Sequence, residues 1–139
     1  MGQQQLLLVI LVTIIVGVAT VVAINVFGQS AENANVDATR QDVLTLAAMS
    51  QGWYIKPELL GGGGGDFSGI GVEELGFGYK KSATATSPIQ TFENANASFV
   101  FSGASTTGLT ITATCKQAPK TVTAVITSND ITSLTVADQ

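Results

Sequence analysis

The sequence predicts an α+β fold in which one long N-terminal α-helix packs on a C-terminal antiparallel β-sheet of about four strands. Three patterns carry this prediction. Residues 6–27 are apolar and uncharged, residues 33–53 repeat apolar side chains at helical spacing, and residues 109–115 alternate apolar and polar side chains. We expect a hydrophobic helix over residues 1–28, its amphipathic continuation over 29–56, a glycine-rich loop region over 57–90 and the sheet over 91–139.

The apolar run is long enough to cross a membrane. Its 22 residues would extend about 33 Å as a helix, which matches the hydrocarbon core of a bilayer. The run is longer than that of a secretory signal peptide and no basic residue precedes it, so we expect the segment to be retained. The first cation is Arg40. A short basic leader, removed just before Met1, would supply the charge that usually orients a membrane helix.

The pattern then becomes amphipathic. Val36, Val43, Ala47 and Ser50 share one helical face, and the nearby acidic side chains lie on other faces. No proline precedes Pro57, so we expect one helix of about 50 residues that ends shortly before it.

Short segments rich in β-forming residues follow at 91–92, 97–102, 109–116, 121–128 and 131–136. The first segment gives the weakest signal. Turn-forming residues separate the last four at 103–108, 117–120 and 128–130. We expect the amphipathic helix to pack on the apolar face of this sheet, against residues such as Leu109, Ile111, Val122, Ala124 and Ile126.

Five consecutive glycines occupy residues 61–65 in the loop after the helix. A phosphate-binding loop would continue with Lys-Ser or Lys-Thr and would lie between a strand and a helix, and neither condition holds. A structured active-site loop is an alternative, but we interpret the run as a flexible connector. Trp53 and Tyr54, just before it, are expected to pack against the sheet.

The composition weighs against several classes of function. The six cations are scattered and the net charge is −4, whereas nucleic acid as a primary ligand requires clustered Lys and Arg. Histidine is absent, which removes the commonest general base, and we expect neither an enzyme nor a cofactor. Asp66, Glu73 and Glu74 could hold calcium, but their spacing matches no known binding loop and surface charge is the simpler interpretation.

Two features raise the question of modification. Asn96-Ala97-Ser98 is an N-glycosylation sequon, so Asn96 is a candidate site. The threonine-rich strand faces could accept O-linked sugars, although β-forming residues with a polar outward side are the simpler interpretation. The single cysteine, Cys115, cannot form an intramolecular disulfide, and we expect it to be a buried small hydrophobe.

The arrangement resembles the type IV pilins. The closest local match is Gln5-Leu6-Leu7-Leu8-Val9-Ile10, which is similar to the Glu-Leu-Leu-Ile-Val-Ile run at the same place in mature bacterial pilins. The resemblance implies a structural subunit of a cell-surface fimbrium with a role in adhesion or motility. Polymerisation would use the residues Gln5, Leu6, Leu7, Val9, Ile10, Ile14, Val16, Gly17, Val21, Ile24 and Phe27.

The resemblance also implies partners and a location. A prepilin peptidase would remove the leader, the helix would cross the inner membrane once, and the pilus assembly machinery would transfer it into an extracellular homopolymer. Three departures are visible: the family's fifth-position glutamate is Gln5, its usual proline is Val22, and its C-terminal disulfide cannot form. With no proline at Val22, Gly17 or Gly28 becomes the expected weak point of the helix.

Two other readings stay open. A pseudopilin of a secretion or DNA-uptake machine would share the fold but form a short periplasmic assembly. A single-pass membrane protein with a small β-rich binding domain would keep the helix in the bilayer. Gene neighbours distinguish the first from a pilus subunit, and the composition of surface filaments distinguishes the second.

Overall fold

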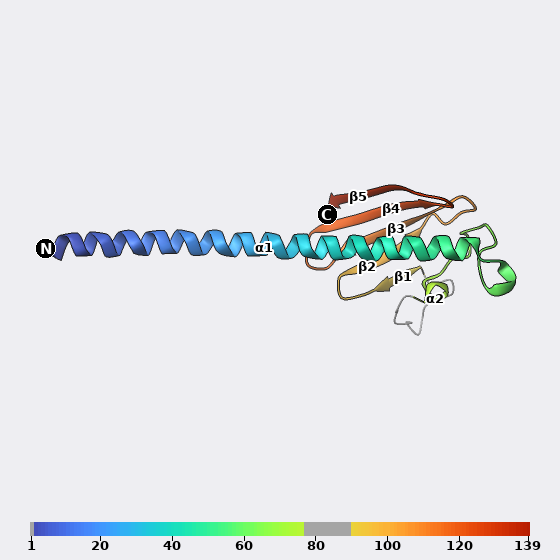
Figure 1. Cartoon of the computed structure of the whole chain (residues 1–139), viewed down its shortest axis with the longest axis horizontal. Helices are drawn as coiled ribbons and strands as arrows, with labels where there is room; N and C mark the ends of the chain where they lie inside the picture. The colour runs from blue at the N-terminus through green and yellow to red at the C-terminus, as the bar shows by residue number, and fades with distance from the viewer. Residues whose placement is uncertain (1, 77–89) are drawn as a thin grey trace. The chain divides into compact units, whose positions relative to one another are not determined.

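The computed structural model describes residues 2–76 and 90–139 and has the predicted α+β fold (Figure 1). The helix α1 (Gly2–Ile55) is followed by a 3-10 turn, η1 (Glu58–Leu60), and a short helix, α2 (Val72–Leu75). Five strands complete the described chain: β1 (Thr91–Glu93), β2 (Ala97–Ser102), β3 (Gly108–Cys115), β4 (Lys120–Thr127) and β5 (Ile131–Asp138). Two compact units divide within α1, Met1–Ala34 and Asn35–Gln139.

The helix α1 has no break at either expected weak point. Residues 2–55 are helical throughout, including Gly17 and Gly28. A glycine costs a helix about 1 kcal/mol, which is far less than the cost of a proline. The absence of a proline before Pro57 therefore permits one continuous hydrogen-bond ladder.

The sheet is an antiparallel meander in the order β1-β2-β3-β4-β5. It has five strands and not about four, because the weak segment forms a three-residue edge strand, β1. The sequence of β1 gives a weak strand signal, and pairing with β2 stabilises it. Thr91 lies opposite Val100, and the Phe92 ring stacks on Phe99 with centroids 4.6 Å apart. Within the last pair of strands, a register irregularity falls between Val125 and Ile126.

The core of the second unit lies between α1 and one face of the sheet. The predicted helix face of Val36, Val43, Ala47 and Ser50 is buried, and so are the five predicted strand residues Leu109, Ile111, Val122, Ala124 and Ile126. Asn35, Thr39 and Leu46 belong to the same helix face but were not predicted. The apolar helix stripe and the inward residues of the strands thus form one hydrophobic core.

The five glycines do not form a flexible connector, and this expectation is corrected. Each donates its backbone N–H to a carbonyl at or just after the end of α1: residues 61, 62, 63, 64 and 65 bind the carbonyls of Glu58, Pro57, Trp53, Lys56 and Tyr54 at 2.9–3.1 Å. Carbonyls at a helix end lack partners within the helix, and the glycine N–H groups satisfy them.

Glycine is required at particular positions of this run. Gly61 has a φ of +79°, which other residues rarely adopt. At Gly63 an added Cβ would collide with the Trp53 ring and the Asp66 carbonyl oxygen. The run therefore folds back on the helix end as an ordered cap.

Candidate functional site

The candidate site is the apolar surface of the first unit. Every residue from Gly2 to Ala31 is exposed, so all of the predicted polymerisation residues, from Gln5 to Phe27, are accessible on α1. The large apolar side chains between residues 6 and 27 are 49% to 74% exposed, Val12 being the lowest and Phe27 the highest. A helix that is hydrophobic on all sides is normally covered by lipid or by protein.

The polar side chains within this stretch include two threonines that are compatible with an apolar environment. Thr13 donates its hydroxyl to the Val9 carbonyl oxygen at 2.7 Å, and Thr20 donates to the Val16 carbonyl oxygen at 2.8 Å. A hydroxyl that is bonded within its own helix does not need water as a hydrogen-bond acceptor. Both threonines can therefore enter lipid or a helix bundle without leaving a donor unsatisfied.

The length and composition of α1 also make it able to cross a membrane, and none of its most apolar window is buried within the chain. A fully apolar helix of about 22 residues presents on the order of 1,000 Å² to its surroundings, and removing that area from water contributes roughly 25 kcal/mol. Exposure of this surface to water is therefore strongly unfavourable.

Two hydrogen bonds join α1 to the turn between β1 and β2 in the second unit. The Asp42 carboxylate accepts hydrogen bonds from Asn94 Nδ2 at 2.8 Å and from Asn96 Nδ2 at 3.0 Å. The candidate glycosylation residue Asn96 thus uses its amide nitrogen to bind the helix. Buried Cys115, as predicted a small core residue, has its Sγ 3.5 Å from the Thr39 hydroxyl.

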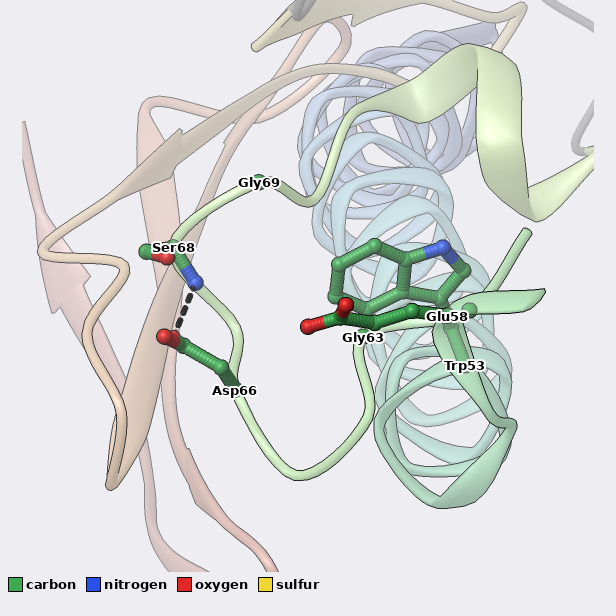
Figure 2. A pocket seen from close by; sticks show the side chains of 7 residues that line it. Trp53, Glu58, Gly63, Asp66, Ser68 and Gly69 are labelled. Atoms are coloured by element: carbon green, nitrogen blue, oxygen red, sulfur yellow. Dashed lines mark hydrogen bonds between the residues drawn. The ribbon is translucent and has the colours of Figure 1, made fainter.

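A pocket of about 230 Å³ lies beside the glycine cap. Figure 2 shows the Trp53 indole on one side and Asp66 with Ser68 on the other, where the Ser68 N–H donates to Asp66 Oδ1 at 2.7 Å. Glu58 and three glycines complete the lining. Glu58 and Asp66 are the titratable groups of the pocket, and it offers Ser68 no basic nitrogen; these groups do not assemble a nucleophile and a base.

Of the other expected residues, Trp53 and Tyr54 pack against the core, and the Tyr54 ring stacks on Phe67 with centroids 4.5 Å apart. Within residues 2–76 and 90–139, no group of three His, Cys, Asp or Glu side chains has metal-binding geometry. Asp66, Glu73 and Glu74 accordingly do not form such a group. The Trp53 Nε1 is buried without a hydrogen-bond partner in the described chain.

No protein-family model matches the sequence, and comparisons with curated proteins and with solved structures give no match. The dominant feature of the chain is the contrast between the ordered second unit and an apolar helical surface that nothing in the described chain covers.

The sequence predicted the apolar surface. It did not predict that the glycine run, Trp53, Glu58 and Asp66 line one pocket. A run of five glycines shortly after a helix end was the available signal, since such a run can supply consecutive N–H groups to the last carbonyls. The buried polar residues Asn35 and Thr39 gave no comparable signal.

Proposed function

We propose that this chain is the structural subunit of an extracellular filament of the type IV pilus kind, polymerising through residues 6–27. The observation that supports it is that every residue of this apolar helical surface is exposed in the isolated chain. Neighbouring copies of the same segment can cover it on all sides. The ordered second unit then lies at the filament surface.

Before assembly, the same segment crosses the inner membrane once. Lipid tails and other apolar helices both keep it out of water, so the hydrophobic effect alone does not choose between them. Close helix packing and interhelical hydrogen bonds favour the bundle. This lets one segment serve first as a membrane anchor and then as the filament core, with transfer driven by assembly machinery.

Surface filaments test the proposal directly. Filaments sheared from cells that make this chain are purified and their subunit is sequenced. We expect this chain as the main protein. Recovery of the chain in the membrane fraction alone, with no filament that contains it, would instead support a single-pass membrane protein.

Thiol labelling then tests which segment forms the filament core. Because Cys115 is 6% exposed, a cysteine introduced by Val16→Cys or Thr106→Cys is the accessible thiol of its variant. In purified filaments a membrane-impermeant maleimide should label the Thr106→Cys variant, at an exposed turn, and leave the Val16→Cys variant unlabelled. Equal labelling of both thiols would contradict the core assignment.

A further inference from the structure

The pocket beside the glycine cap combines an aromatic ring with negative charge. Its lining includes the Trp53 indole and the carboxylates of Glu58 and Asp66. Figure 2 shows the indole ring face on, with its nitrogen on the side away from Asp66. The Glu58 carboxylate points toward the side of the pocket that Asp66 and Ser68 form. A ligand in this space would therefore meet an aromatic ring and two anionic groups.

Glycines keep this space open. An added Cβ at Gly63 would collide with the Trp53 ring, and one at Gly69 would touch the same ring at 3.8 Å. At Gly64 it would lie 2.8 Å from Cγ of Glu58. The backbone hydrogen bonds of the cap fix the glycine run, and the indole packs against the core. The pocket is therefore formed before any ligand enters, which lowers the entropy cost of binding.

The negative charge of the pocket is not balanced by the described part of the chain. Neither Glu58 nor Asp66 forms an ion pair with a residue in the ranges 2–76 and 90–139. Asp66 Oδ1 accepts the Ser68 N–H, which is a neutral donor. Two carboxylates that line one small pocket repel each other, and a cation placed between them removes this repulsion. The electrostatics of the pocket therefore favour a positively charged ligand.

We propose that this pocket binds a small organic cation, an alkylammonium group such as the trimethylammonium of choline. The face of an aromatic ring attracts such a cation, and tryptophan does so most strongly. A calcium ion would need about six to eight oxygen ligands, and the described residues hold no group of three metal-binding side chains. The volume of about 230 Å³ is below that of sites for drug-sized ligands, so it suits one cationic group.

Fluorescence titration of the full chain in a maltoside detergent tests the proposal. Trp53 is the single tryptophan of the chain, so its emission reports on the pocket. Choline chloride replaces sodium chloride at constant ionic strength, and we expect a saturable change in emission with a Kd in the millimolar range or below. The neutral analogue of choline, in which a carbon atom replaces the nitrogen, should give no saturable change. Equal responses to the two ligands would overturn the proposal, because the pocket would then recognise shape without charge.

Matched variants test the role of the carboxylates. Glu58→Gln and Asp66→Asn each remove one charge with little change of size, and the asparagine keeps an acceptor for the Ser68 N–H. Each should raise the Kd for choline about 2- to 10-fold, and the double variant should lose the saturable response. Glu74→Gln removes an exposed carboxylate on α2 that does not line the pocket, and should leave the Kd unchanged. Equal weakening by Glu74→Gln would overturn a specific site.

Titration with calcium chloride tests the inorganic alternative. Calcium should neither produce a saturable change in Trp53 emission nor displace choline. A response to calcium without a response to choline would assign the pocket to a metal ion and overturn the proposal. The lining residues all belong to the second unit, so the titration does not depend on polymerisation. The comparison of choline with its neutral analogue uses the unaltered chain, and it decides the proposal even where a variant fails to fold.

Discussion

Asn35 on α1 donates from Nδ2 to the carbonyl oxygen of Asn96, 61 positions away in the sequence, at 3.1 Å. Its Oδ1 accepts the backbone N–H of Gln117 at 3.3 Å, and the residue is only 6% exposed. One buried amide therefore joins the helix to two separate turns of the sheet. We expect Asn35→Leu to lower the free energy of unfolding by about 1–3 kcal/mol, because two hydrogen bonds of about 0.5–1.5 kcal/mol each are lost.

Thermal and urea denaturation of the full chain in detergent measures this loss. Asn33→Leu is the matched control, because Asn33 is an exposed asparagine on the same helix. Its substitution should change stability by less than about 0.5 kcal/mol. Equal effects of the two substitutions would mean that the Asn35 hydrogen bonds do not hold the turns.

Asn35 also shows where sequence reasoning reaches its limit. Val36, Val43 and Ala47 were predicted to be buried because apolar residues at helical spacing identify a core face. Asn35 and Thr39 lie on the same face, but apolar spacing alone does not identify them, and Asn35 binds residues far along the sequence. The three-residue strand β1 was similarly weak in the pattern, since its burial depends on the neighbouring strand.

The glycine run gives a second lesson of this kind, because its composition is that of a flexible linker while its N–H groups cap a helix. We expect Gly63→Ala to destabilise the chain by about 1–3 kcal/mol, since the new Cβ meets the Trp53 ring and a backbone carbonyl. Gly52→Ala, within α1 and with nothing near its added Cβ, should stabilise it by about 0.5–1 kcal/mol. In the same denaturation assay, Gly63→Ala should lower the free energy of unfolding and Gly52→Ala should raise it. If the glycine run were flexible, Gly63→Ala would not lower the free energy of unfolding.

The stability of the protein at acid pH should depend on one exposed ion pair, Glu93 and Lys116. The Lys116 ammonium donates to Glu93 at 3.0 Å and lowers the pKa of that carboxyl below its ordinary range, with a further contribution from the Ser98 hydroxyl. A carboxyl whose pKa is lower in the folded state than in the unfolded state stabilises the folded protein at pH values above the ordinary glutamate pKa. This stabilisation is lost as the pH falls through the pKa of Glu93 in the folded protein. Glu93→Gln should remove that part of the acid destabilisation.

The urea denaturation midpoints of the wild-type protein and of Glu93→Gln, compared at pH 7, 5 and 3, measure the contribution of the Glu93 charge to stability. The wild-type advantage should be small because the pair is exposed, should shrink towards pH 3, and should weaken in high salt. A wild-type advantage that stays the same at all three pH values would show that Glu93 does not contribute through its charge.

A charge in the proposed filament core should stop assembly. Val16 is 57% exposed in the isolated chain, and polymerisation would bury Val16→Asp as an unpaired carboxylate at a cost of several kcal/mol. We expect filament yield to fall at least about 100-fold, since each 1.4 kcal/mol is roughly a factor of ten. Val16→Thr is the matched control, because its hydroxyl can bond to the preceding turn as Thr13 and Thr20 do.

Membrane fractionation of the Val16 variants accompanies the yield measurement. If Val16→Asp inserts into the membrane but does not assemble, the defect belongs to polymerisation. Normal filaments from Val16→Asp would mean that this part of α1 is not buried in the polymer.

The last prediction concerns Gln5, where the chain departs from the pilin pattern. Gln5 lies in the first turns of α1, where backbone N–H groups lack acceptors within the helix. Its neutral amide can bind such groups, or a terminal amine, on a neighbouring copy. Neutral hydrogen bonds depend little on ionic strength or on protonation, so wild-type assembly should change little with salt and between about pH 5 and 8.

Two substitutions separate polarity from charge at this position. Gln5→Glu should still assemble, because a carboxylate can pair with a neighbour's amine, but its yield should become sensitive to salt and should fall as the carboxylate is protonated. Gln5→Leu keeps a similar size and loses the hydrogen bonds, so its filaments should be fewer and less regular in helical register. Filament yield and symmetry by electron microscopy, compared for the three chains at low and high salt, measure both effects. Wild-type yield and symmetry for Gln5→Leu would show that the register is set by the apolar side chains alone.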